Sequence, residues 1–218
     1  MQRALVYTRT TRYRHDSIPA GIAALRELGR DAGLAVDATE EPEAFTPENL
    51  GGYQVVVFLS TSGEVLTDGG RAAFSEWVRA GGGFVGVHLA AGTEPDWGFF
   101  GELVGARFTR HPHFQPAVVT VEDQRHPATS HLPAQWMFDD EWYEFDANPR
   151  GMARVLASVD ERCYEGGTSG LDHPLAWCHE HCGGRSFYTA LGHAEAAYAD
   201  HRFRAHLEGA LTWAARLD

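Results

Sequence analysis

The chain has 218 residues, enough for one substantial hydrophobic core, and we expect residues 1–218 to form a single domain. With 44% hydrophobic and 11% aromatic residues, its composition is that of a globular protein, and its N-terminus turns polar too early for a signal peptide, so we expect a cytoplasmic protein without a membrane partner. The formal charge of −12 argues against nucleic acid as a partner, because nucleic acid binds basic surfaces.

The first half of the sequence alternates between strand and helix patterns. Apolar runs predict strands at residues 3–8, 34–38, 54–59 and 84–87. Helical patterns follow at 18–32 and 67–80, capped by Ser17 and Thr67. This alternation predicts a parallel sheet with helices on both faces, in which ligands bind at the carboxyl ends of the strands. The loops that carry His15, residues 60–63 and His88 should therefore meet at one rim.

After Asp96 the pattern changes to short strands without helices between them. The predicted strands are at residues 116–123, 141–145, 154–159, 174–180 and 185–191. Consecutive strands favour antiparallel pairing, and the last two form a hairpin around Gly183 and Gly184. An amphipathic helix over about 200–215 closes the chain. The sequence therefore predicts an α/β fold with a mostly parallel central sheet and additional antiparallel strands in the C-terminal half.

The segment GGGFVGVHLAAG at residues 81–92 is the strongest functional signal. His88 directly follows the buried strand FVGV, at a turn where many α/β enzymes place a serine or cysteine nucleophile. Small neighbours allow backbone N–H groups to approach a ligand, and imidazole titrates near neutral pH. His88 is therefore predicted to be an acid, a base or a ligand. The alternative is a buried histidine satisfied by backbone hydrogen bonds.

Three further candidates for catalysis lie at strand ends or on a predicted strand. His15 is on the loop after the first strand, and His193 follows the last predicted strand. Strand alternation over 141–145 places Glu141 and Tyr143 on one face. A carboxylate acts as acid, base or metal ligand, and a phenol donates to a sugar oxygen. The alternatives are an exposed loop histidine and a solvated acidic edge.

Histidine and carboxylate side chains also suit a divalent metal such as zinc, manganese or iron. The ligands would be some of four residues, namely His15, His88, Glu141 and His193. The pair His111 and His113 is a second option, because strand alternation would place both on one side. The run CHEHC at 178–182 does not match a zinc motif, because on a strand its cysteines and histidines face opposite ways.

Seven ordered motifs resemble the ThuA-like family, named for a trehalose-utilisation protein. They are YRHDSI at 13–18, GGGFVGVHLA at 81–90, His111 and Pro112 with Gln115, HPAT at 126–129, DEWYEF at 140–145, DHPLAW at 172–177 and GGRSFYTALGH at 183–193. The resemblance covers nearly the whole chain. It implies a flavodoxin-like, three-layer core similar to class I glutamine amidotransferase domains. It also implies a role in carbohydrate metabolism, on trehalose, related disaccharides or their keto derivatives.

The amidotransferase relatives carry a cysteine at the turn where this chain has His88. Imidazole does not readily replace a thiolate in forming a thioester, so glutaminase activity is not expected. One hypothesis is an enzyme of hydrolase, lyase or isomerase type that acts on a sugar or keto-sugar, with His88 and Glu141 as acid/base partners. The other is a non-catalytic carbohydrate-binding or regulatory module.

Five residues are candidates to contact a small-molecule sugar: Tyr143, Trp97, Gln115, Arg185 and Tyr188. Aromatic rings stack on sugar faces, and the arginine can bind hydroxyl or carboxylate groups. The same aromatic side chains can instead belong to the core. Apolar helix faces and edge strands also permit a homo-oligomer.

Overall fold

The apolar runs of the first half form the parallel part of a nine-stranded sheet. In the computed structural model, which describes residues 2–217, these strands are β1 (Gln2–Tyr7), β2 (Leu34–Thr39), β3 (Val55–Leu59) and β4 (Gly83–Val87). Every residue of β3 and β4 is buried, as expected for strands covered on both faces. The strands pair in parallel in the order β2-β1-β3-β4, which confirms the predicted parallel sheet.

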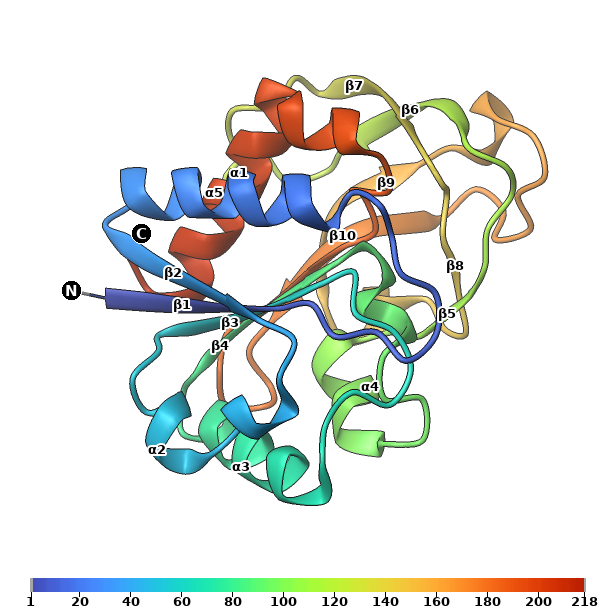
Figure 1. The fold of residues 1–218 in the computed structure, drawn as a ribbon. Coiled ribbons are helices and arrows are strands. Elements are labelled where there is room, and N and C mark those ends of the chain that lie inside the picture. The colour runs from blue at the N-terminus through green and yellow to red at the C-terminus, as the bar shows by residue number, and fades with distance from the viewer. Residues whose placement is uncertain (1, 218) are drawn as a thin grey trace.

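Helices lie against both faces of this sheet. They are α1 (Ile18–Asp31), α2 (Pro47–Leu50), α3 (Asp68–Arg79), α4 (Gly98–Val104) and α5 (His201–Ala214). Figure 1 shows α1 and α5 together on one face and α2, α3 and α4 on the other. Among residues 2–217, none of these helices combines the length and the apolar character that a membrane crossing needs.

The two predicted helix caps have different outcomes. The Thr67 side chain accepts the Gly70 N–H at 3.0 Å, which confirms it as the cap of α3. Ser17 makes no side-chain cap bond, and its hydroxyl instead donates to the Gly192 carbonyl at 3.5 Å. A proline in the first turn of α1 has no N–H group, which reduces the need for a side-chain cap there.

The second half of the chain extends the same sheet with antiparallel strands. These are β6 (Gln115–Val121), β7 (Gln135–Asp140), β9 (Arg154–Val159), β10 (His173–His179) and β11 (Ser186–Thr189). The order continues from β4 as β11-β10-β9-β6-β7. β11 runs parallel to β4 and antiparallel to β10, so the predicted hairpin is confirmed and joins the two halves of the sheet.

The predicted strand 141–145 is wrong over its first three residues. Only β8 (Glu144–Phe145) is a strand, and it pairs with β5 (Phe108–Arg110) in a separate two-stranded sheet. The chain leaves β7 after Asp140, whose buried carboxylate accepts the N–H of Glu141 at 2.8 Å. This bond turns the backbone out of the strand.

The sequence did not predict α4 or β7. α4 has only seven residues and contains a glycine, so its periodicity is weak. Phe100 of α4 packs on Phe58 and Phe84, with ring centroids 5.3 and 5.8 Å apart, and this packing anchors the chain beyond His88. Five 3-10 turns complete the described elements: η1 (Pro42–Ala44), η2 (His88–Gly92), η3 (Pro149–Gly151), η4 (Glu161–Cys163) and η5 (Glu195–Ala199).

Candidate functional site

His88 occupies the sharp turn at the end of β4 that the sequence predicts. Its backbone φ is +53°, and η2 begins at this residue. A side chain in this left-handed region costs about 1–2 kcal/mol relative to glycine. The side chain is completely buried. A strained backbone conformation is therefore maintained at the residue where the sequence places the functional group.

Hydrogen bonds from β11 and the chain after it fix the orientation of His88. Its Nδ1 lies 2.7 Å from the Ala190 carbonyl oxygen, which can only accept, so Nδ1 carries the proton. In the neutral ring Nε2 is then an unprotonated acceptor. The Tyr188 hydroxyl donates to the His88 carbonyl at 2.8 Å.

The side chains of four predicted residues converge beside this nitrogen. His88 Nε2 lies 3.1 Å from His15 Nε2 and 3.7 Å from Glu141 Oε2, and Glu141 Oε2 lies 3.1 Å from His193 Nδ1. One potential ligand atom from each of the four lies within 4.8 Å of all the others. The Tyr143 hydroxyl is 2.7 Å from His88 Nε2. The loops after β1, β4, β7 and β11 therefore meet at one rim.

The rim also includes the loop after β3, as predicted. The Thr11 N–H donates to the Ser62 carbonyl at 2.9 Å, and the Ser60 N–H donates to the Val87 carbonyl at 3.1 Å. Thr61 and Thr93 share a hydrogen bond of 2.7 Å between their hydroxyl groups. These contacts hold the loop with His15 and the turn at His88 against the same short segment.

The charges in the cluster are set by burial and by contact between its members. Burial, together with the neighbouring histidines, lowers the pKa of His15 to about 3, so this ring is neutral. Burial alone would raise the pKa of Glu141, but the nearby His193 and His88 outweigh it and lower that pKa. The same contact with Glu141 raises the pKa of His193. The cluster therefore presents one anionic carboxylate among imidazole rings.

Asp140 supports the cluster and was missed by the sequence prediction. Its fully buried carboxylate accepts the N–H groups of Glu141 and Gly192, each at 2.8 Å, and of His193 at 3.3 Å. Burial raises its pKa. It thereby ties two cluster residues together although they are far apart in the sequence. The inward alternation of Trp136, Phe138 and Asp140 along β7 is the signal that could have found it.

Of the five candidate sugar contacts, Tyr143 and Tyr188 bond to His88, and the other three interact with residues outside the cluster. Trp97 packs against Phe99 and Phe100, with ring centroids 5.3 and 6.2 Å away. The Gln115 amide donates to the Glu165 carbonyl at 2.9 Å. Arg185 donates to the Trp213 carbonyl at 2.8 Å and lies over its ring.

The two alternative metal motifs also differ from their predicted geometry. His111 and His113 lie between β5 and β6, outside any strand, and His111 Nδ1 faces Glu141 at 3.5 Å. The predicted separation of histidines from cysteines in 178–182 is wrong, because β10 ends at His179 and the following turn brings His181 and Cys182 to it. Their potential ligand atoms lie within 4.8 Å of one another.

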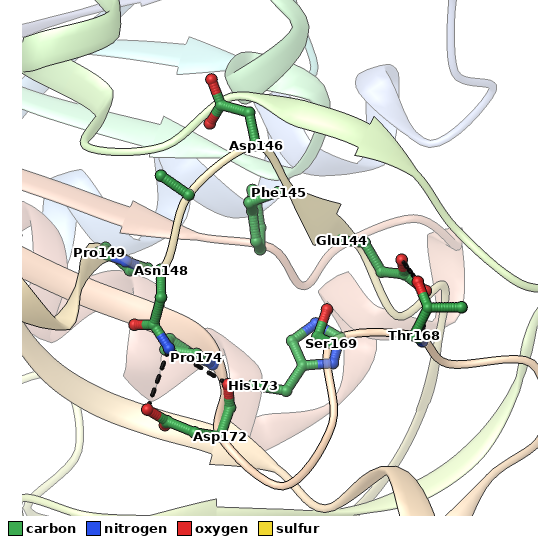
Figure 2. Close-up of a pocket in the computed structure, with 11 residues that line it drawn as sticks. Glu144, Phe145, Asp146, Asn148, Pro149, Thr168, Ser169, Asp172, His173 and Pro174 are labelled. Atoms are coloured by element: carbon green, nitrogen blue, oxygen red, sulfur yellow. Dashed lines mark hydrogen bonds between the residues drawn. The ribbon is translucent and has the colours of Figure 1, made fainter.

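A cavity of about 270 Å³ lies close to the cluster in the fold but is lined by other residues. Figure 2 shows its lining, from the segments 144–149, 168–169 and 172–174. His173 connects the two regions, because its Nε2 donates to the Tyr143 carbonyl at 2.7 Å. Two polar side chains of the cavity are paired with carboxylates, since the Thr168 hydroxyl donates to Glu144 and the Asn148 amide donates to Asp172.

Solved structures with a similar fold include two ThuA-like proteins and a β-galactosidase. A ThuA-like protein from Bacteroides uniformis is 26% identical, with a TM-score of 0.82 over 98% of this chain and 91% of its own. A ThuA-like protein from Parabacteroides merdae is 22% identical, with a TM-score of 0.81 over 98% and 90%. A β-galactosidase from Rahnella sp. R3 is 16% identical, with a TM-score of 0.63 over 100% of this chain but 32% of its own.

The fold and the rim define an α/β protein with a buried histidine and carboxylate cluster at the carboxyl ends of its strands. The family model for ThuA, described as trehalose utilisation, matches residues 3–214. The chain therefore belongs to the ThuA family, as its motifs predict. No curated protein is significantly similar to it in sequence.

Proposed function

We propose that the protein is an enzyme that acts on a sugar or keto-sugar of the class to which trehalose and its oxidised derivatives belong. The observation that carries this proposal is the convergence of His15, His88, Glu141 and His193 at the strand ends. His88 is oriented to take a proton at Nε2, and the Glu141 carboxylate stabilises the imidazolium that results. His193, whose pKa is raised, is the corresponding proton donor.

A divalent metal fits the same four side chains. Two nitrogen ligands of a tetrahedral zinc ion are about 3.3 Å apart, close to the 3.1 Å between His88 Nε2 and His15 Nε2. The bond from His88 Nδ1 to the Ala190 carbonyl is the kind of outer contact that orients a metal-binding histidine. His15 Nδ1 is buried without a hydrogen-bond partner. A bound ion would polarise a sugar carbonyl or hydroxyl oxygen.

The finer description of the fold is part of the proposal. The strand order β2-β1-β3-β4-β11 corresponds to the 2-1-3-4-5 order of flavodoxin-like sheets, and this supports a flavodoxin-like, amidotransferase-like core. The continuous sheet supports a single domain over the chain. Histidine in place of a cysteine at the turn supports a chemistry other than glutamine hydrolysis.

The test compares two cluster variants with a matched surface histidine. In His88→Gln and Glu141→Gln, turnover of the keto derivative of trehalose, followed by NMR, should fall at least a hundredfold. His113→Ala, which changes an exposed histidine, should keep wild-type turnover. Undiminished turnover in His88→Gln would refute the catalytic role.

Elemental analysis of the purified wild-type protein tests the metal separately. A stoichiometric divalent metal should be present and should be lost from Glu141→Gln and His193→Ala but retained in His113→Ala. If no stoichiometric metal is found and a chelator leaves turnover unchanged, the metal part of the proposal is wrong.

A second candidate function is a carbohydrate-binding or regulatory module without catalysis. The complete burial of His88 and the 4% exposure of His15 favour it, since a reactive group must reach its substrate. Glu141 and His193 are the more exposed members, with side chains 12% and 25% accessible. Thermal stabilisation by disaccharides, without product under any metal or cofactor condition, would identify the protein as such a module.

A further inference from the structure

A second cavity, of about 300 Å³, adjoins the cluster and is lined mainly by apolar side chains. Its lining comes from four segments near the rim, at residues 12–13, at residue 62, within 89–95 and at 107–109. Leu89 directly follows His88 in the chain. A ligand in this cavity would therefore lie next to the turn that presents His88.

Two aromatic side chains connect this cavity to the cluster. The Tyr13 ring is 4.7 Å from the His15 ring, in an edge-on arrangement. The Phe108 ring is 4.4 Å from the Tyr143 ring, which itself contacts His88. Tyr13 is 62% exposed, an unusual exposure for a large aromatic residue in this chain. Both rings line the cavity, so a planar group bound there can pack against them.

Most polar groups in the lining already have partners inside the protein. The Ser62 hydroxyl donates to the Tyr13 carbonyl at 2.7 Å, and the Thr109 hydroxyl donates to the Glu144 carbonyl at 3.0 Å. The Arg107 guanidinium donates to backbone carbonyls, including that of Trp97 at 2.6 Å. Arg12, at the exposed rim, is the remaining charged donor. A second sugar ring would leave most of its hydroxyl groups without partners here, which is costly on burial.

We propose that this cavity binds the apolar, aromatic aglycone of a glycoside whose sugar ring lies against the cluster around His88. The inference rests on the proposed function and specifies its substrate class. In this substrate the group attached to the sugar ring is aromatic, whereas in trehalose it is a second sugar. Arg12 at the rim would donate hydrogen bonds to a polar or anionic substituent on that group.

Binding affinities of three matched glycosides test this assignment. Dissociation constants are measured by calorimetry for the keto derivatives of methyl α-glucoside, phenyl α-glucoside and trehalose. The phenyl compound should bind at least tenfold more tightly than the methyl compound, because its ring removes apolar surface from water. It should also bind more tightly than the trehalose derivative.

Variants on the two sides of the cluster locate the binding. Phe108→Ala and Tyr13→Ala should remove most of the preference for phenyl over methyl, and the exposure of Tyr13 keeps the second variant foldable. Phe114→Ala is the matched control, since Phe114 is 43% exposed and contacts the cluster through His193, at 5.6 Å between rings. It should keep the preference.

The proposal is overturned if methyl and phenyl compounds bind equally, if the trehalose derivative binds most tightly, or if Phe114→Ala alone removes the preference. Because the active protein would convert these compounds, the affinities are measured in the His88→Gln background. Undiminished turnover in His88→Gln refutes the proposed catalysis, whereas equal affinities for the methyl and phenyl compounds refute the assignment of this cavity.

Discussion

Replacing His88 by glycine and by alanine separates the strain at the turn from the chemistry of the imidazole. Both variants lose the ring, its packing and the hydrogen bond to the Ala190 carbonyl. They differ in the backbone, because residue 88 has a φ of +53° and only glycine adopts this conformation without steric cost. We therefore expect His88→Gly to be the more stable of the two, although glycine usually destabilises a protein relative to alanine.

The magnitude follows from the two opposing terms. A non-glycine residue in the left-handed region costs about 1–2 kcal/mol, and the greater flexibility of glycine in the unfolded chain offsets roughly 0.5–1 kcal/mol of that. The expected difference is about 1 kcal/mol in favour of His88→Gly. Both variants should be less stable than the wild type by about 2–4 kcal/mol, because the buried Ala190 carbonyl loses its donor and a cavity remains.

Urea unfolding at neutral pH measures this difference, and the melting temperatures should differ by about 2–4 °C. Ala90→Gly in the same turn is the control, since Ala90 is buried and has an ordinary φ; it should be destabilised by about 1 kcal/mol. Equal stability of the two His88 variants, or a more stable alanine variant, would show that the strained turn is not present in solution.

Three further predictions concern buried charges. His206 donates from Nδ1 to the Ala128 carbonyl at 2.7 Å, and burial lowers its pKa to about 4. As the pH falls, His206 is protonated in the unfolded chain before it is protonated in the folded one, so its contribution to stability should be complete above about pH 6.5 and fall by about 3 kcal/mol towards pH 4. Urea unfolding across that range should show a weaker pH dependence of stability in His206→Gln. Asp140→Ala leaves three backbone N–H groups without their acceptor and should lower the free energy of unfolding, measured in urea, by about 3 kcal/mol or more. Asp140→Asn keeps an acceptor oxygen and should lower it by less; equal losses in the two variants would contradict the role of the carboxylate. Glu94→Ala removes a buried carboxylate that accepts the N–H groups of Val65 and Leu66, so it should lower the free energy of unfolding by about 3 kcal/mol. A loss below about 1 kcal/mol in urea unfolding would contradict this role.

The parallel half of the fold could be predicted because its strands are apolar on both faces. A short run such as 54–59, rich in β-branched residues, is typical of a strand in the middle of a covered sheet. β7 could not be recognised in the same way, because its inward positions end in Asp140, a charged residue whose carboxylate accepts backbone N–H groups of Glu141 and of the distant segment 192–193. Periodicity carries no information about such a long-range partner.

Within the site, strand ends predicted the position of His88, His15 and His193, since the sheet itself brings them together. Glu141 and Tyr143 reach the cluster as predicted, but by a different route, because the chain is irregular at 141–143. Strand alternation therefore placed both side chains near His88, although the strand it assumed is not there. The partner of Arg185 could not be predicted from the sequence. The residue lies in the hairpin between β10 and β11, and nothing in that position indicates its hydrogen bond to the Trp213 carbonyl.

The proton arrangement in the cluster favours a ligand over a purely structural role. His88 Nε2 has one lone pair, and both the Tyr143 hydroxyl at 2.7 Å and His15 Nε2 at 3.1 Å are directed at it. If His15 carries its proton on Nε2, its buried Nδ1 is an acceptor without a donor; if the proton is on Nδ1, two unprotonated nitrogens face each other. Each arrangement leaves a buried polar atom unsatisfied, which proteins rarely maintain without a functional reason. A cation held by both Nε2 atoms, or a substrate hydroxyl between them, would satisfy these two facing nitrogens, and this supports the proposed role of His88 in binding a ligand.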